Sequence, residues 1–254
     1  MADKNQFQQA LERLGSSASL KEAKEHCHSI DNKWDVGIDT VFKTLLKYPE
    51  LASGAIKANE DKIFIQKWVH KYFTGYENRP SQKTGNPPKG VADTIIDNAI
   101  KTRFELLNEN ELNNIKYAHR ISETVEMLIG DFLEEYLAII LPRYSWHCAW
   151  GATIKAVDFV SENNRLLQIK NRSNSENSSS RAIRKGTTIE HWFRIHAGKG
   201  ETYWDRLNEI CGADIILSEE DFRTFVIKSI KDNPACIGID QDSPLLIKKH
   251  FELF

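Results

Sequence analysis

The sequence lacks the features that mark membrane proteins and small disulfide-rich proteins. Within its 254 residues no stretch approaches the roughly 18 consecutive apolar residues of a transmembrane helix, and the beginning, MADKNQFQQALERLG, is polar and amphipathic. The four cysteines, Cys27, Cys148, Cys211 and Cys236, lie far apart without a C-x-x-C pair. This spacing argues against a disulfide scaffold and against a structural zinc site. We therefore expect a protein of a reducing intracellular compartment, the cytoplasm.

The chain also lacks a net charge that would indicate a partner, because its 34 Lys and Arg residues nearly balance its 36 Asp and Glu residues. The distribution of charge is nevertheless uneven. Between Arg165 and Gly200 there are eight Lys or Arg residues and two acidic residues, Glu176 and Glu190. A segment of about +6 in a weakly acidic chain concentrates the attraction for phosphate on one face.

The first half of the chain has the pattern of packed helices. Apolar residues recur at helical spacing in residues 3–15, 36–51, 60–73, 91–104 and 114–141, and Pro142 closes the last segment. Residues 74–90 are rich in Pro, Gly and polar residues, which predicts a long surface loop. We take residues 1–110 as a helical N-terminal region.

The second half changes in pattern. Two short apolar, β-branched segments, residues 152–160 and 165–171, flank a turn-like SENN and predict a β-hairpin. Beyond it the sequence predicts, in order, helices over 187–195 and 202–210, a buried strand over 213–217, and a helix over 218–230 capped by Ser218. The fold class is therefore α/β, with an α/β core over residues 111–254 behind an all-helical N-terminal half.

Three polar side chains in the predicted hairpin carry a candidate chemistry. Asp158 lies in the first strand, and Gln168 and Lys170 are two residues apart in the second, so their side chains leave the same face. A carboxylate and an amide oxygen are ligands that suit Mg²⁺, and a neighbouring lysine can orient an attacking water. Alone, Asp158 could be an ordinary acid at a strand end and Lys170 a lysine at a sheet edge. Their convergence beside a basic segment favours the catalytic interpretation.

The polar segment after Lys170 has the composition of a DNA-contacting surface. Arginine can donate two hydrogen bonds to guanine and asparagine can pair with adenine, whereas Ser and Asn side chains also contact phosphates. The candidate DNA-binding residues are Arg172, Asn174, Ser175, Asn177, Arg181 and Arg184. The arginines could instead clamp phosphates, and the segment could be a disordered linker, although its position between core elements argues against a linker.

These residues resemble a known family. The spacing VD, nine residues, QIK resembles the signature of PD-(D/E)xK nucleases, with Gln168 where the family more often has Asp or Glu. The upstream IGDFLEEYLA resembles the helix that precedes the hairpin in these nucleases, with Gly130 and Glu134 as its G-x-x-x-E pair. The longer string LLQIKNRSNSENSSSRAIR resembles type II restriction endonucleases of the SinI type, which cut GGWCC or related sites. This closer resemblance covers about residues 130–217, and residues 1–110 have no comparable match.

The resemblance implies a complete set of expectations. The fold would be a restriction-endonuclease-like core, a mixed β-sheet flanked by helices, and the catalytic residues would be Asp158, Gln168, Lys170 and Glu134. Asp158, Gln168 and Glu134 would hold Mg²⁺, and Mn²⁺ would substitute for it. The partners would be double-stranded DNA, a second copy of the chain and a cognate DNA methyltransferase, in a bacterial or archaeal cytoplasm. Residues 1–110 would serve dimerisation or clasp the duplex.

The uncharged Gln168 leaves two other interpretations open. The chain could be a repair or mobile-element nuclease that reads DNA structure, or a non-catalytic DNA-binding protein whose nuclease site has decayed. An amide binds Mg²⁺ more weakly than a carboxylate, so Glu134 would have to contribute more to the site. Other acids on the same predicted helix, such as Asp131 and Glu135, could simply be solvated.

Overall fold

A computed structural model describes residues 4–87, 93–104, 108–174, 178–212, 217–240 and 243. Its helices and strands are, in order, α1 (Gln6–Leu14), α2 (Ser16–Ser29), α3 (Val36–Lys47), α4 (Asp61–Glu77), α5 (Thr94–Arg103), α6 (Glu109–Ile140), β1 (Trp146–Cys148), β2 (Phe159–Ser161), β3 (Leu166–Arg172), α7 (Ser178–Arg184), β4 (Ile189–Ile195), α8 (Trp204–Cys211) and α9 (Glu219–Asp232). Short 3₁₀ turns are η1 (Pro49–Leu51), η2 (Leu141–Tyr144), η3 (Trp150–Ala152) and η4 (Pro234–Cys236). The protein is thus mixed α/β, as the sequence predicts.

The chain divides into two compact units. The first comprises Met1–Arg79 and Leu133–Phe225, and the second comprises Pro80–Phe132 and Val226–Phe254. The helix α6 begins in the second unit and ends in the first. All candidate catalytic residues belong to the first unit, whereas the division of function at residue 110 remains a prediction.

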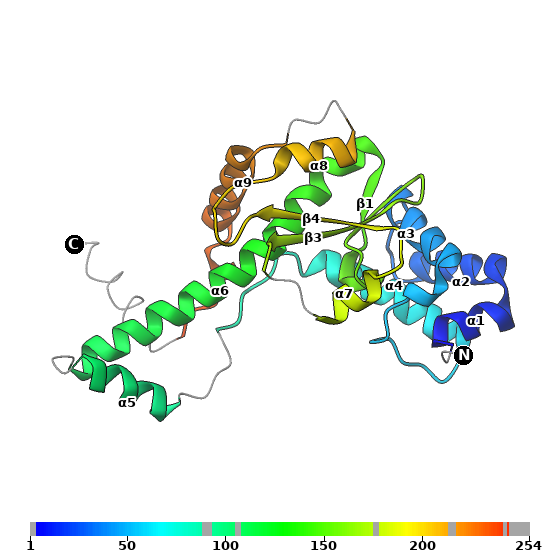
Figure 1. Cartoon of the computed structure of the whole chain (residues 1–254). Helices are drawn as coiled ribbons and strands as arrows, with labels where there is room; N and C mark the ends of the chain where they lie inside the picture. The colour runs from blue at the N-terminus through cyan, green and yellow to red at the C-terminus, as the bar shows by residue number, and fades with distance from the viewer. Residues whose placement is uncertain are drawn as a thin grey trace. The chain divides into compact units, whose positions relative to one another are not determined.

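The sheet of the first unit is mixed. Its order is β1-β2-β3-β4, with β1, β2 and β3 antiparallel and β4 parallel to β3. A parallel pair requires a crossover, and α7 lies in it between β3 and β4. Figure 1 shows β3 and β4 side by side, with α8 on one side of them and α7 on the other.

The hairpin turn of the sequence prediction is confirmed at residues 161–164. Asn164 adopts the left-handed conformation with φ 62°, and its amide donates to the Ser161 carbonyl oxygen at 2.8 Å. The preceding strand is shorter than predicted, because Ala152 and Ala156 also have positive φ and interrupt extended backbone. Regular pairing is left to Phe159–Ser161, and Ile154 forms only an isolated bridge with Ala52.

The predicted helix over residues 187–195 is wrong, because this segment forms β4. Its buried residues, Ile189, Trp192 and Arg194, include a three-residue interval that imitates helical spacing. The backbone instead pairs in parallel with β3 from Leu166–Ile189 to Arg172–Ile195. That partner is remote in sequence, so local periodicity does not reveal it.

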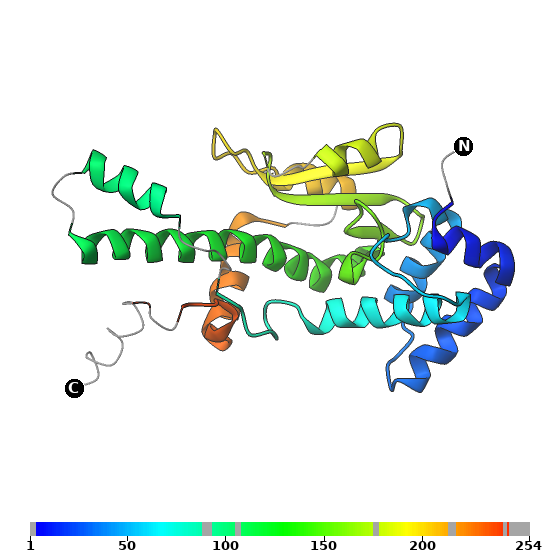
Figure 2. The same cartoon turned by 90° about the horizontal axis from the view of Figure 1, so that it is seen from below.

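The N-terminal helices share one hydrophobic core with the sheet. Phe42 and Trp68 of α3 and α4 belong to the same buried cluster as Val160 and Leu166 of β2 and β3. Figure 2 shows α1 to α3 gathered around one end of α4. The approach between α4 and η3 is very close: a methyl group on Gly75 would lie 2.1 Å from the Gly151 nitrogen.

Most of the predicted helices are confirmed. α1 ends at Gly15, which has φ 80°, and the Ser218 hydroxyl caps α9 by accepting a hydrogen bond from the Asp221 amide at 3.2 Å. The sequence prediction omitted α2, β1 and α7. The segment predicted as a buried strand over 213–217 lies outside the described residues except for Leu217.

Several polar contacts connect the described segments of the second unit. Lys83 pairs with Asp131 at 2.9 Å, and the Asn233 side-chain amide donates to the Lys83 carbonyl oxygen at 2.9 Å. Lys116 of α6 pairs with Asp97 of α5 at 2.8 Å.

Among the helices that the structure describes, none is both long and apolar enough to cross a membrane.

Candidate active site

Asp158 and Gln168 lie near each other at the open end of the hairpin. The antiparallel register pairs Phe159 with Leu167, and it ends there because the amide of the preceding Asp158 also donates to the Leu167 carbonyl oxygen, at 2.9 Å. The Asp158 carboxylate bonds to the Ile169 amide, so it lies beside β3 next to Gln168. Lys170 follows two residues later on the same face of β3. The structure therefore brings together three of the four residues that the sequence predicts as catalytic.

Burial, a hydrogen bond and a nearby positive charge all act on the Asp158 carboxylate. Its Oδ2 accepts a hydrogen bond from the Ile169 amide at 2.8 Å. Burial raises the pKa of the Asp158 carboxyl, and the Lys170 ammonium and the Ile169 amide oppose this shift by favouring the ionised form. A cation bound beside Asp158 would act in the same direction as Lys170 and hold the carboxyl ionised.

Gln168 carries an unsatisfied polar atom at the centre of this arrangement. The side chain is 2% exposed, and no group in the described residues forms a hydrogen bond with its Oε1. Leaving a buried acceptor unsatisfied costs about 1–3 kcal/mol, so such an atom indicates a partner that is not part of the polypeptide. An amide oxygen is a suitable ligand for a hard cation. The site therefore fits a divalent metal ion.

Glu134 reaches the same region from α6. Its Oε1 accepts a hydrogen bond from the Cys148 thiol at 3.3 Å. Burial raises the pKa of that thiol well above its usual value, and the carboxylates of Glu134 and Asp158 raise it further. Cys148 thus lies close to both carboxylates, and it stays protonated and able to donate to Glu134.

Other acids of α6 are engaged elsewhere. Asp131 pairs with Lys83, and Glu135, which is buried, pairs with Arg79 at 3.3 Å. Within the described residues no three His, Cys, Asp or Glu side chains are grouped so that they could hold a metal ion by themselves. A cation at this site would therefore depend on the Gln168 amide and on oxygen atoms from outside the chain.

The basic segment beyond β3 divides into structural and exposed cations. Arg165 is paired with Glu190 at 2.7 Å, and Arg194 is buried between Asn171 and Glu219. These two arginines are therefore part of the packing of the unit.

The predicted DNA-binding residues lie at the end of β3 and on α7. Arg172, Asn174 and Arg181 are exposed, and Arg184 is half-buried. Ser175 and Asn177 lie outside the described residues.

Comparison with known proteins gives a consistent match over most of the chain. The family model described as SinI restriction endonuclease matches residues 21–232. The type II restriction enzyme Eco47I of Escherichia coli is 35% identical over 211 residues, which cover 80% of this chain and 90% of that enzyme. The type II restriction enzyme SinI of Salmonella infantis is 34% identical with the same coverage. The chain belongs to the SinI restriction endonuclease family.

Membership of the SinI family makes the chain an enzyme of the type II restriction class and corrects one sequence interpretation. Residues 1–110 were expected to have no family match, yet the match begins at residue 21, within α2. The N-terminal helices from residue 21 onward are therefore part of the region that matches the family.

His191 is a residue of this SinI-family site that the sequence analysis missed. It stands in register with Gln168 on the neighbouring strand β4. Burial lowers its pKa to about 4, and the nearby Arg184 and Lys170 charges contribute in the same direction. The imidazole is therefore neutral at physiological pH. The incorrect helix prediction over residues 187–195 concealed its position.

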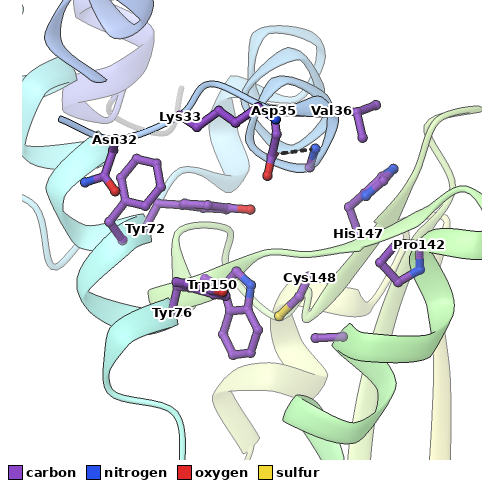
Figure 3. Close-up of a pocket in the computed structure, with 13 residues that line it drawn as sticks. Asn32, Lys33, Asp35, Val36, Tyr72, Tyr76, Pro142, His147, Cys148 and Trp150 are labelled. Atoms are coloured by element: carbon purple, nitrogen blue, oxygen red, sulfur yellow. Dashed lines mark hydrogen bonds between the residues drawn. The ribbon is translucent and has the colours of Figure 1, made fainter. Parts of the chain in front are cut away.

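A pocket of about 380 Å³ adjoins the Glu134 side of the site. Figure 3 shows it between α4, which carries Tyr72 and Tyr76, and β1, which carries His147 and Cys148. Cys148 is thus both a wall of this pocket and the hydrogen-bond donor to Glu134. No sequence motif indicates this role for Cys148.

Trp192 and Trp204 belong to the core of the unit, although they border the basic segment. Both are buried, and their ring centroids are 5.3 Å apart. Their indole nitrogens donate to the Tyr203 carbonyl oxygen at 2.7 Å and to Glu219 at 2.8 Å. They are therefore not available as platforms on which DNA bases could stack.

Proposed function

We propose that this chain is a Mg²⁺-dependent type II restriction endonuclease that cleaves double-stranded DNA at a short palindromic, GGWCC-like site. The observation that carries the proposal is the convergence of Asp158, Gln168 and Lys170 beside a basic segment, in a member of the SinI family. The mixed sheet with α6 delivering Glu134 supports a restriction-endonuclease-like core of the PD-(D/E)xK type.

The four catalytic candidates have separate tasks in this proposal. Asp158, Gln168 and Glu134 supply oxygen atoms to the metal ion, and the Lys170 ammonium orients the attacking water and offsets charge on the phosphate. When bound, Mg²⁺ would stabilise the charge that develops on the phosphodiester and make its own bound water more acidic. Cleavage would leave 5′-phosphate and 3′-hydroxyl ends. Mn²⁺ would substitute for Mg²⁺.

DNA recognition is proposed for the exposed segment that follows β3. Arg181 and Arg184 are the first candidates for reading guanine, and Arg172 is the next. Asn174, Ser175 and Asn177 would contact bases or phosphates. A palindromic site calls for a two-fold protein, so we propose a homodimer, with residues 1–110 contributing to the dimer or clasping the duplex. A cognate methyltransferase would protect the cytoplasmic DNA of the host.

A plasmid digest tests this function directly. Purified protein is incubated with a plasmid that carries mapped GGWCC sites, in Mg²⁺, in Mn²⁺ and in EDTA, and the ends of the fragments are sequenced. Discrete fragments in either metal and none in EDTA are expected. The variant Asp158→Asn should abolish cleavage, whereas Asp205→Asn, an exposed acid of α8, should cut normally.

The other outcomes separate the competing functions. Nicking at branched or damaged DNA without discrete fragments would indicate a repair or mobile-element nuclease. DNA binding without cleavage in either metal would show that the site has lost catalysis.

A further inference from the structure

Two residues that are paired in register on β3 and β4 each carry a buried polar atom without a partner among the described residues. These atoms are Gln168 Oε1 and His191 Nε2, and neither forms a hydrogen bond with any group in the part of the chain that the structure describes. The residues are paired in the parallel register, so their side chains leave the same face of adjacent strands. Two unsatisfied atoms on paired residues indicate one missing partner that serves both.

The chemistry of the two atoms restricts what that partner can be. The amide oxygen of Gln168 can only accept hydrogen bonds or bind a cation, and a neutral imidazole nitrogen has a lone pair that can do the same. Water could satisfy both atoms by donating twice. A divalent cation would satisfy both and would also attract the Asp158 carboxylate, which lies beside Ile169 of β3.

The charges around this position favour a cation that arrives with DNA. The carboxylates of Asp158 and Glu134 both act on Cys148, and Lys170 and Arg184 are the charges that act on His191. The two signs offset each other in the protein alone. Phosphate oxygens of bound DNA would tip this balance toward a cation.

We propose that His191 is a further metal ligand of this enzyme and binds the same divalent cation as Gln168 and Asp158. The proposal rests on the proposed nuclease function. β4 then supplies an additional ligand, which compensates for the weak metal binding of the uncharged Gln168. Mixed nitrogen and oxygen ligation has a measurable consequence, because a nitrogen ligand favours Mn²⁺ and Co²⁺ over Mg²⁺.

The test measures metal binding without relying on cleavage. Mn²⁺ and Mg²⁺ are titrated into the full chain by calorimetry, with and without a duplex that contains GGWCC. All proteins carry Lys170→Ala, which prevents cleavage and removes one opposing positive charge. With the duplex, His191→Ala should weaken Mn²⁺ binding by about tenfold or more and Mg²⁺ binding by less.

A second variant separates ligation from a role in folding. His191→Gln replaces the nitrogen with an amide oxygen, so it should restore Mg²⁺ binding while the preference for Mn²⁺ stays low. His28→Ala, an exposed histidine of α2, serves as the control and should leave both affinities unchanged. Thermal unfolding verifies that each variant is folded.

The outcomes distinguish this proposal from the function on which it rests. Unchanged Mn²⁺ affinity in folded His191→Ala, or an equal loss for both metals, would overturn the ligand role and leave a bridging water. If the wild-type chain fails to cut plasmid DNA but the Mn²⁺ preference depends on His191, the nuclease function fails and the metal site stands.

Discussion

Gln168 is the residue at which a single charge should change metal binding most. Gln168→Glu adds a carboxylate beside Asp158, and the nearby Lys170 and Arg184 charges offset the added repulsion. We expect the affinity for Mg²⁺ to increase by about tenfold, because the added charge attracts the cation directly. Calorimetry in the presence of DNA measures this affinity, and plasmid cleavage should persist.

The control for this substitution is Gln66→Glu on α4, far from Asp158 in sequence and bonded to Glu22. It adds the same negative charge away from the proposed metal site, so the affinity for Mg²⁺ should stay constant. A loss of Mg²⁺ affinity in Gln168→Glu would mean that Gln168 does not contact the metal.

Cys148 should act as a positioning residue for Glu134. Cys148→Ala removes the thiol that donates to Glu134 at 3.3 Å, and Cys148→Ser retains a donor at the same place. Because burial and two carboxylates hold the thiol pKa well above its usual value, the thiol donates throughout the working pH range. We expect Cys148→Ala to require a several-fold higher Mg²⁺ concentration for cleavage than the wild type. Cys148→Ser should require nearly the wild-type concentration.

Rescue by serine is the decisive comparison for Cys148. If alanine and serine variants require the same Mg²⁺ concentration as the wild type, Glu134 does not depend on this hydrogen bond. Equal loss in both would indicate that the size of the sulfur atom matters for packing instead.

At the scale of elements, α7 and the end of β3 should determine how DNA is held. Arg181→Ala should lower the affinity for the cognate duplex by about 1–3 kcal/mol and reduce base discrimination if Arg181 reads guanine. If it contacts phosphate, affinity should fall equally for all sequences and the salt slope should shrink by about one. Binding isotherms on cognate and altered duplexes at several salt concentrations separate the two. Arg206→Ala, an exposed arginine of α8, is the control.

The strands show where sequence reasoning succeeds and where it stops. The hairpin could be predicted because its turn residues and its two strands are adjacent, so Gln168 and Lys170 could be placed on one face. Asp158 was expected within the first strand, but it lies just before β2 and reaches β3 through the Ile169 amide. β4 could not be predicted, because its backbone partner is reached only through a crossover and its buried residues imitate helical spacing. For the same reason, His191 could not be placed beside Gln168 from the sequence.

Contacts between elements were equally beyond the sequence. Glu134 could be proposed only from a resemblance, and its contact with Cys148 depends on how α6 packs against β1. The arrangement of N-terminal helices and sheet in one core also has no local pattern, since each helix shows only that one of its faces is apolar.

At the scale of the whole molecule, the contact between Gly75 and Gly151 should govern stability. Gly75→Ala would place a methyl group 2.1 Å from the Gly151 nitrogen, which forces α4 away from η3. We expect a loss of about 1–3 kcal/mol in the free energy of unfolding, because a backbone contact cannot yield as a side chain can. Denaturant unfolding measures this change.

The matched control is Gly130→Ala on α6. A methyl group there has no neighbour within 4 Å, so the substitution should be neutral or stabilise the helix by up to about 1 kcal/mol. If both alanine variants unfold alike, the close approach of α4 and η3 does not limit stability.

The crossover between β3 and β4 also bears on the safety of the cell that makes this protein. The side chains proposed to hold the metal come from α6, β3, β4 and the residue that precedes β2, and β4 follows Lys170 by about twenty residues. A growing or unfolded chain therefore has catalytic residues but no catalytic centre. Because parallel pairing closes late and slowly, competence to cut DNA should arise only once synthesis is well advanced. Partial translation products that end before β4 would then be unable to cut the host chromosome.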